Sequence, residues 1–470
     1  MFRTCLPAGR YKENLVNRVN PVKKVPPQAA KFNYTYRQMN ILNPSTTHPS
    51  LFDLIIRFCK ILKRYGLSSK KMESNLTLYL LILQKHNVVP SFPITAKVLS
   101  KYPKLINRMM KKGAELAVHG YKHIDYSRLS EEEILRHLEK AVKIFQEQSI
   151  PFFGFRFPYL RYNNKGTDIL GKFFCWDSSH TILWNGLEKT RFSKRNWQNY
   201  QHVLKQYNYR NSDNCCSLPR FQNNVLELPV SLPDDDLLID RLGIKHGEVL
   251  AQIWGEILEQ TYSRGELYTL QLHPERIPLC KDALDALLRK AQTYAPPMWI
   301  AQLGEISRWW RERRAVKLEI SRLGRDRYEV KTQGSERSSV LVKDAGVDCA
   351  TEEFFGPYVI AKARQFVLHS HVPPVLGIAQ STSEEYIDFL KAEGFEVRIG
   401  CNEDSCGMYL ETDGEFKEES KRQILDTIEH TPGPLIRIWR WPMGARSALA
   451  ITGDIDSITL VDFWNRILGG

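Results

Sequence analysis

The sequence predicts an α/β protein whose main domain is a distorted (β/α) barrel of seven or eight strands. Three observations predict this fold. Between residues 88 and 303, short apolar segments alternate with amphipathic helical patterns, which is typical of a parallel sheet or barrel. Several of these segments end at a histidine or an arginine, at the strand ends where barrels keep their chemistry. A further apolar segment at 447–453 stands far from the others and is placed to fill a gap in the barrel.

The chain of 470 residues is long enough for two or three domains. We expect a basic arm at 1–47, the barrel at 48–314 together with 447–470, a small β-rich domain at 315–372 and an α/β segment at 373–446. Residues 1–50 supply eight Lys or Arg against Glu13, so much of the net charge of +13 comes from the arm. Because the rest has no stripe of basic and aromatic residues, we expect no nucleic-acid partner.

Cysteine usage and the apolar segments indicate where the protein works. Nine cysteines, an odd number without a C-x-x-C pair, are typical of reduced thiols in a cytosolic protein. No signal peptide is visible, and the longest apolar run, around 78–83, is far too short to span a bilayer. We therefore expect a cytoplasmic protein with no membrane span, and the sequence leaves its oligomeric state open.

The barrel domain opens on helices. Ser50 and Asp53 are placed to cap an amphipathic helix that ends near Gly66, and a second helix follows from about Ser69. The apolar segment 88–95 indicates a strand. A helix up to Lys112 and a short strand ending at His119 come next.

From there, helix and strand patterns alternate. Ser130 and Glu133 form a capping box for one helix, and further helices are expected near 248–263 and 280–293. Strands are expected at 154–157, 173–178, 225–232, 267–273 and 298–303. This gives seven strands, while the strand that should precede the first helices is missing.

Beyond Trp310 the pattern changes. Residues 316–345 alternate apolar and polar side chains between glycine-containing turns, which indicates a small antiparallel β unit. Residues 375–398 fit a strand, a helix and a second strand. The apolar strand at 447–453 stops at Asp454-Ile455-Asp456, and a helical tail at 460–467 closes the chain.

Four groups of residues that could act in catalysis or metal binding lie at or just past the carboxyl ends of predicted strands. They are His119 with His123, Arg156, His273, and Asp454 with Asp456. Two histidines four residues apart can reach one divalent ion, and Asp456 would complete a set of two imidazoles and one carboxylate that suits zinc. Asp454 would lie on the same face of an ideal strand as Asp456. We therefore expect a divalent metal ion as cofactor, with zinc as the expected metal.

These motifs resemble those of the polysaccharide deacetylases of the NodB-homology type. The resemblance rests on H-G-Y-K-H at 119–123, R-F-P-Y at 156–159, L-Q-L-H at 270–273 and T-G-D-I-D at 452–456. That family carries its paired aspartates on the first strand, ahead of the histidines, whereas here they follow them. Because the barrel lacks a first strand and the chain supplies one at its other end, we interpret this order as a circular permutation.

The resemblance implies a hydrolase that removes the N-acetyl group from an N-acetylated sugar or polysaccharide. It implies Asp454 as the base acting on water, with Arg156 orienting that aspartate. It further implies that Tyr159 offers its backbone N–H to the oxyanion and that His273 protonates the leaving amine. Each of these roles is chemically reasonable for amide hydrolysis.

Two other functions stay open. One is a catalytically inactive carbohydrate-binding or scaffold protein that kept the barrel, and the other is a hydrolase of a non-sugar linear or cyclic amide. Asp177 and Asp234 are further candidates for contacting the substrate or supporting the metal ligands. Asp234 opens a run of three aspartates after Pro233, so it also fits a helix cap.

Overall fold

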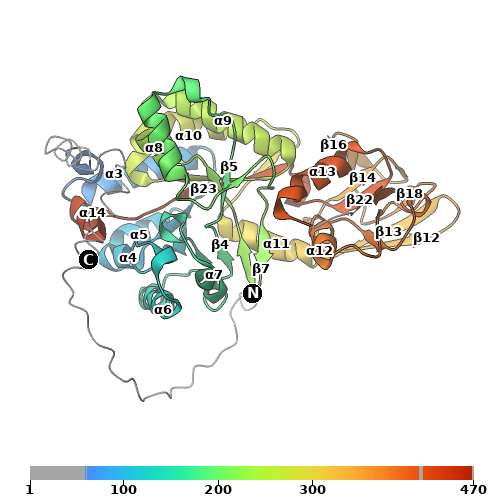
Figure 1. The fold of residues 1–470 in the computed structure, drawn as a ribbon, viewed down its shortest axis with the longest axis horizontal. Coiled ribbons are helices and arrows are strands. Elements are labelled where there is room, and N and C mark those ends of the chain that lie inside the picture. Colours follow the sequence, from blue (N-terminus) through green and yellow to red (C-terminus); the bar gives the residue numbers. More distant parts are fainter. Residues whose placement is uncertain (1–58, 60, 412–415, 468–470) are drawn as a thin grey trace, which may run out of the picture.

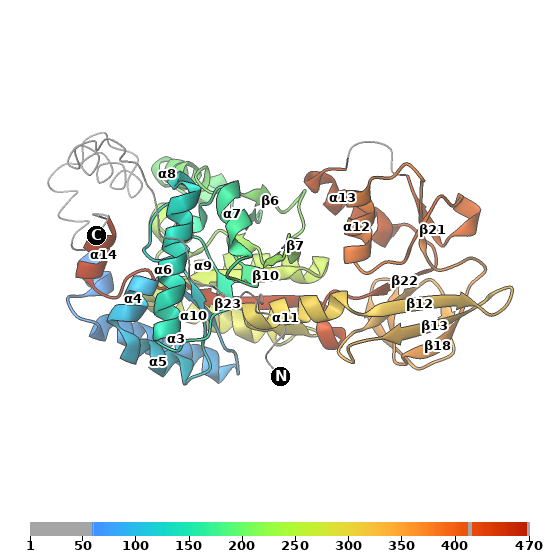
Figure 2. The same ribbon diagram turned by 90° about the horizontal axis from the view of Figure 1, so that it is seen from below.

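The structure is a computed structural model that describes residues 59, 61–411 and 416–467 (Figure 1). The arm expected at 1–47 and the helix cap expected at Ser50 and Asp53 lie outside these residues. One large, mainly parallel sheet and its helices form the main body, and α11 (Leu303–Arg314) leads from it to a second group of smaller sheets (Figure 2).

The large sheet curls into a distorted barrel. Its core strands follow one another as β9 (Val230–Leu232), β10 (Leu267–Leu272), β23 (Ser447–Gly453), β1 (Ser91–Ile94), β2 (Glu115–Val118), β3 (Gly154–Phe155), β4 (Trp176–Asp177) and β8 (Val225–Glu227). The first and last of these belong to one extended segment, in which only two residues separate β8 from β9. The pairing therefore returns to its start, and the predicted α/β barrel is confirmed in this distorted form.

Four short strands extend the sheet around this core. β5 (Thr181–Leu183) pairs with β9, β6 (Arg210–Asn211) with β5, β7 (Arg220–Gln222) with β8, and β11 (Met298–Ile300) with the first half of β23. Only the pairing of β7 with β8 is antiparallel in this sheet, within the described residues. The expected strands at 173–178 and 298–303 are thus present but shorter than predicted.

β23 lies beside β1, where the missing strand was expected. From the order of the predicted strands, the one at 298–303 is the expected neighbour on the other side of β23. That side belongs to β10, which pairs with six residues of β23 from Ala448 to Gly453. β11 and β1 share the opposite side, since β11 pairs with residues 447–449 and β1 with Thr452. All seven residues of β23 are buried, so it is an interior element of the sheet.

Side chains of β23 alternate between two cores. Leu449 and Ile451 pack against the covering helices, whereas Ala448 and Ala450 belong to a second core together with Trp176. This inner core is tightly filled, because a Cβ on Gly154 would lie 1.9 Å from the Trp176 indole. Alternation along the strand therefore decides which residues reach the barrel interior.

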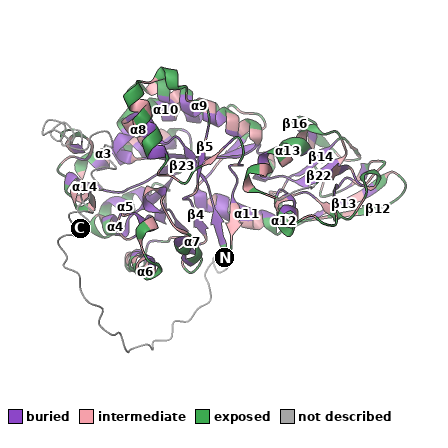
Figure 3. Ribbon diagram, viewed as in Figure 1, coloured by how far each residue is buried: buried purple, intermediate pink, exposed green. Residues whose placement is uncertain are grey.

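Helices cover the outer face, with their buried sides toward the strands (Figure 3). They are α3 (Lys70–Lys85), α4 (Ala96–Lys101), α5 (Pro103–Met110), α6 (Glu131–Glu147), α7 (Asn164–Leu170), α8 (Lys194–Leu204), α9 (Gly247–Arg264), α10 (Ile277–Ala291) and α14 (Leu460–Ile467). The capping box of α6 is confirmed: the Ser130 hydroxyl accepts the Glu133 N–H, and the Glu133 carboxylate accepts the Ser130 N–H. The helices α7 and α8 were not predicted.

The smaller sheets lie beyond α11. Two of them are antiparallel and have four strands each. The first has the strand order β12 (Lys317–Arg322), β13 (Arg327–Gln333), β18 (Gln365–His369) and β15 (Gly346–Val347). The second has the order β16 (Thr351–Phe355), β17 (Tyr358–Ala361), β14 (Val340–Lys343) and β22 (Leu435–Ile438). A parallel sheet of β20 (Val397–Ile399), β19 (Leu376–Ile378) and β21 (Met408–Leu410) carries α12 (Glu384–Ala392) and α13 (Lys421–His430). β22 comes from the segment expected to be α/β, yet it pairs with β14. The domain boundaries themselves stay a prediction.

Two further features concern the chemical surroundings of the chain. The eight cysteines in the described part of the chain are free thiols. Among its described helices, none combines the length and the apolar character that crossing a bilayer requires.

Candidate active site

β23 delivers two carboxylates to its carboxyl end. Asp454 and Asp456 follow the last strand residue, and both face the residues at the ends of β2 and β3, as the two-residue spacing predicts. Ile455 between them points into the helix-covered core. Gly453 allows close packing on that outer side, because a Cβ there would lie 2.5 Å from the Phe92 ring. The two carboxylates therefore share one site.

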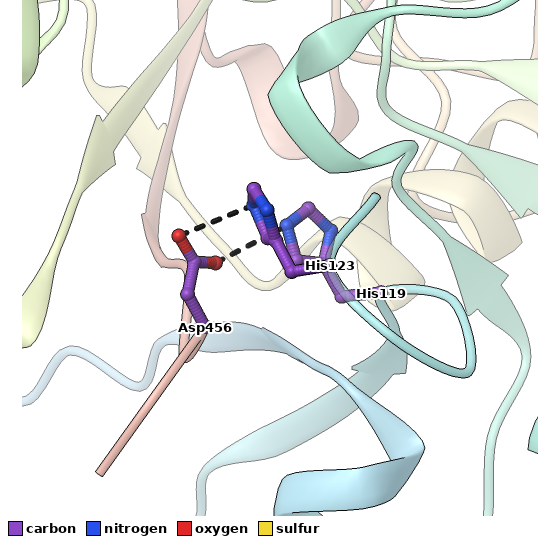
Figure 4. Close-up of side chains that lie close together, drawn as sticks. All are labelled: His119, His123 and Asp456. Carbon is purple, nitrogen blue, oxygen red and sulfur yellow. Dashed lines mark ion pairs between the residues drawn. The ribbon is translucent and has the colours of Figure 1, made fainter. Parts of the chain in front are cut away.

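Asp456 faces both predicted histidines, with one carboxylate oxygen toward each (Figure 4). Its Oδ1 is 3.4 Å from His119 Nε2, and its Oδ2 is 3.2 Å from His123 Nε2. The His119 backbone N–H donates to the Ile94 carbonyl and so continues the pairing of β2 with β1. One ligand atom from each of the three side chains lies within 4.8 Å of the others. The structure thus brings together all three residues of the predicted metal site.

The lone pairs of this cluster suit a metal ion. His119 Nδ1 is 2.8 Å from the Arg156 carbonyl oxygen, so that nitrogen carries the hydrogen and Nε2 keeps its lone pair. His119 Nε2 and Asp456 Oδ1 are buried and have no hydrogen-bond partner among the described residues. Two imidazoles and one carboxylate form a ligand set of the kind that binds zinc and leaves positions for water and substrate. These residues therefore fit a divalent ion.

Burial and charge keep the cluster in its metal-binding form. Burial, together with the nearby Arg466, lowers the pKa of His123 well below its usual value, so its imidazole is neutral. Burial opposes ionisation of Asp456, but the Arg466 cation holds the pKa of its carboxyl well below its usual range. Arg466, from α14, donates through Nη1 to Asp456 Oδ2 at 2.7 Å. The last helix thus contributes a charge that the sequence analysis did not anticipate.

Arg156 fixes the second carboxylate. Its guanidinium is fully buried, and Nη1 donates to Asp454 Oδ1 at 2.7 Å and to the Thr452 hydroxyl at 2.9 Å. Ser178 holds the rest of the guanidinium, because Nε donates to its carbonyl at 2.8 Å and Nη2 to its hydroxyl at 2.9 Å. A buried, fully hydrogen-bonded charge pair is rigid, so Arg156 determines how Asp454 is oriented.

Gln271 holds the other oxygen of Asp454, and the sequence analysis did not single it out. Its Nε2 donates to Asp454 Oδ2 at 2.8 Å, and its side chain is buried. It stands two residues before His273 in β10, and alternate residues of a strand share a face. The motif L-Q-L-H therefore contained the signal that places Gln271 beside the site.

His273 is paired with Asp235 rather than with Asp234. Its Nδ1 is 2.6 Å from Asp235 Oδ1, and its backbone N–H donates to Asp235 Oδ2 at 2.7 Å. Asp234 Oδ1 accepts the Leu237 N–H and so caps the short helix η4 (Asp236–Arg241). Although Asp234 lies near His273 and Asp235, both oxygens of Asp235 are already engaged. The structure supports the capping role of Asp234 that its position after Pro233 allows.

The charge of His273 follows from this pairing. Burial would lower its pKa, but the Asp235 carboxylate outweighs burial and raises the pKa of His273 well above its usual value. The imidazole is therefore protonated at neutral pH, which is the form that a proton donor requires.

Asp235→Asn should move the alkaline limb of the pH–rate profile to lower pH by about one unit or more, since burial then lowers the pKa of His273 without opposition. In the parent, that limb should lie above the ordinary histidine value of about 6.5. The measurement is kcat/KM against pH, with the exposed Asp282→Asn as the control for the same substitution. An alkaline limb that stays in place would exclude His273 as the titrating acid.

Asp177 points away from the metal ligands. Its neighbour Ser178 faces the site, so alternation turns Asp177 outward, where the Ser179 hydroxyl donates to its Oδ1 at 2.7 Å. Burial and the adjacent Glu227 raise the pKa of Asp177 well above its usual value. The Ser179 hydroxyl also accepts the Phe157 N–H at 2.9 Å. Asp177 therefore supports the backbone beyond β3 and does not face the ligand cluster.

Tyr159 borders the cluster. Its ring centroid lies 4.2 Å from that of His123 at an interplanar angle of 81°, and its hydroxyl accepts a hydrogen bond of 3.4 Å from Arg466 Nε. Its φ of 60° is in the left-handed region, which is uncommon for a residue with a side chain. Strained backbone of this kind clusters at functional sites.

Residues 69–173 match the family model of polysaccharide deacetylase. This part of the chain is a polysaccharide deacetylase domain. It contains His119, His123, Arg156 and Tyr159, and the match indicates a hydrolase that acts on carbon–nitrogen bonds other than peptide bonds. His273, Asp454 and Asp456 lie outside the matched residues of the polysaccharide deacetylase domain, so their assignment rests on geometry.

The chain is also similar to solved structures. A protein assigned as a polysaccharide deacetylase from Pseudomonas aeruginosa PAO1 is 20% identical over 50% of this chain and 72% of its own, with a TM-score of 0.40. The allantoinase Puue is 18% identical over 50% and 72%, with a TM-score of 0.40. A CE4 family pseudoenzyme from Bacillus anthracis is 18% identical over 30% and 50%, with a TM-score of 0.23. No curated protein sequence matches the chain.

Proposed function

We propose that this chain is a metal-dependent hydrolase that removes the N-acetyl group from an N-acetylated sugar or polysaccharide. The observation that supports it most is the convergence of three groups at one end of the barrel. The ligand cluster around Asp456 lies beside Asp454, which Arg156 holds, and a protonated His273 stands on the neighbouring strand. A metal site, a base and an acid together suit hydrolysis of an amide.

His119, His123 and Asp456 would hold the ion, and we propose zinc. A bound zinc ion would lower the pKa of a water molecule toward about 7 and polarise the amide carbonyl. Asp456 keeps one oxygen for this purpose, because Arg466 donates to the other.

The protein's own residues then divide the remaining work. Asp454 accepts a proton from the attacking water, and Arg156 keeps its carboxylate oriented. The backbone N–H of Tyr159 donates to the oxygen on which negative charge develops. His273 gives its proton to the nitrogen as the C–N bond breaks, so the products are acetate and a free amine.

The test is a metal analysis of the purified protein combined with an acetate-release screen. We expect about one divalent ion per chain and acetate released in equal amount to free amine from N-acetylated sugars or polysaccharides. Linear and cyclic amides without a sugar belong in the same panel. Turnover of those amides alone would support the second hydrolase that we considered, and carbohydrate binding without any turnover would support the inactive binding protein.

Asp454→Asn should lower turnover by about 10² to 10⁴, the usual contribution of a general base. The fold and the metal content should be unchanged, because Asn fills the same space and Asp454 is not among the three ligands. Acetate release, metal content and thermal melting are measured together, with the exposed Asp282→Asn as the control. Parental turnover of Asp454→Asn would show that another group takes the proton.

The strand order supports our proposal of a circular permutation. β23, which follows all the other strands in the sequence, pairs with β1, and both aspartates come directly after it. We also propose the cytoplasm as the location, because the eight described cysteines are free thiols and would need a reducing compartment to stay so.

A further inference from the structure

The amide of Gln271 is only half satisfied. Its Nε2 donates to Asp454, whereas its Oε1 is buried and has no hydrogen-bond partner among the described residues. The two ends of the amide are not interchangeable here, because a carboxylate oxygen accepts and only the NH₂ group can donate to it. A buried amide oxygen without a donor is unusual in a folded protein and destabilises it. The site therefore offers an acceptor whose donor comes from outside the described side chains.

The position of this acceptor connects it to the base. Asp454 Oδ1 accepts a hydrogen bond from the Arg156 cation, whereas the donor to Oδ2 is a neutral amide, so a proton goes more readily to Oδ2. This same Oδ2 receives the Gln271 N–H and lies 3.8 Å from His119 Nε2 in the ligand cluster. The free Oε1 belongs to the same planar amide, one amide group away from the N–H that reaches the basic oxygen. Gln271 thus stands where the attacking water must be oriented.

We propose that Gln271 positions the attacking water. Its N–H holds the basic oxygen of Asp454, and its Oε1 accepts the hydrogen of the water that Asp454 does not take. One O–H bond of the water then breaks toward Asp454 as the new C–O bond forms. The second hydrogen stays on the water oxygen, where its hydrogen bond to Oε1 of Gln271 fixes the direction of the attacking lone pair. Gln271 itself gains and loses no proton. This inference rests on the proposed hydrolysis.

The Gln271→Met variant tests this role, because Met has a similar length but neither donates nor accepts a strong hydrogen bond. We expect kcat to fall about 10- to 100-fold, since a misoriented reactant commonly costs this much. KM should stay within about threefold of the parent, because Gln271 acts on the water and not on bound substrate. Metal content and thermal melting should match those of the parent.

Thr269→Val is the matched control. Thr269 lies two residues earlier on the same face of β10, is buried, and also carries a hydroxyl without a partner among the described residues. The substitution removes a buried polar atom from the same strand without touching Asp454. Its kcat should stay within about twofold of the parent. Gln271→Glu is a second variant, which keeps an acceptor but removes the N–H donor, and it should also lose kcat.

Several results would overturn the inference. One is a kcat of Gln271→Met within about twofold of the parent value. Another is a kcat of Thr269→Val that falls as far as that of Gln271→Met. The third is a loss of kcat/KM in Gln271→Met that comes entirely from a higher KM. If Gln271→Met does not fold, a parental kcat of Gln271→Glu overturns it in the same way. Failure of the proposed function is distinguishable, because the parent itself would then release no acetate.

Discussion

Asp456→Ala should lose the divalent ion and, with it, nearly all acetate release. Asp456 is the one carboxylate of the ligand cluster and lies against both histidines. Loss of a residue that merely supports a metal ligand costs about 10- to 100-fold in affinity, so loss of a ligand should cost at least about 100-fold. The metal retained after dialysis against a chelator measures this effect.

The control must separate metal loss from misfolding. Asp456→Ala leaves Arg466 without its carboxylate, whereas Asp456→Asn keeps an oxygen that can accept the Arg466 hydrogen bond. Both variants should keep the circular-dichroism spectrum of the parent and lose the ion. Asp454→Asn should keep the ion. Full metal occupancy in Asp456→Ala would remove Asp456 from the ligand set.

A chain that ends at Pro442 should not form a soluble, metal-binding barrel, although it keeps both histidines. The missing β23 is buried along its whole length and pairs with β10 on one side and with β1 and β11 on the other. Its loss opens two sheet edges and exposes apolar surface. Burial of Leu449 and Ile451 alone contributes about 3 to 6 kcal/mol, comparable with the stability of a marginal domain.

Single substitutions test how much the burial of β23 contributes to stability. Leu449→Ala should lower the free energy of unfolding by about 2 to 5 kcal/mol, because Leu449 is fully buried. Val461→Ala, at a position that is 54% exposed in α14, should change it by less than about 0.5 kcal/mol. Urea unfolding compares the two. A soluble truncated chain that still binds the ion would show that β23 is dispensable.

Part of the candidate site could be predicted because it depends on local spacing. His119 and His123 are four residues apart at a strand end, and Asp454 and Asp456 are two apart on one strand face. Such neighbours are brought together by the backbone itself. Their meeting with each other across the barrel was predicted only because the chain lacked one strand and carried a spare one.

Other members of the site could not be located in this way. Asp235, and not Asp234, holds His273, although both stand in one run of aspartates. Which of two adjacent side chains faces a partner depends on how the chain turns after its strand, and local pattern does not determine that turn. Arg466 reaches Asp456 only because α14 packs back beside the strand end.

The sequence by itself determined the α/β class, the apolar strand at 447–453 and the capping box at Ser130. These depend on periods of a few residues, which each segment carries in its own side chains. Only the tertiary structure decided that β10 flanks β23 and that Gln271 holds the second oxygen of Asp454. Gln271 and Asp454 are separated by 183 positions in the chain. Their contact follows from strand order and register, which are properties of the assembled sheet.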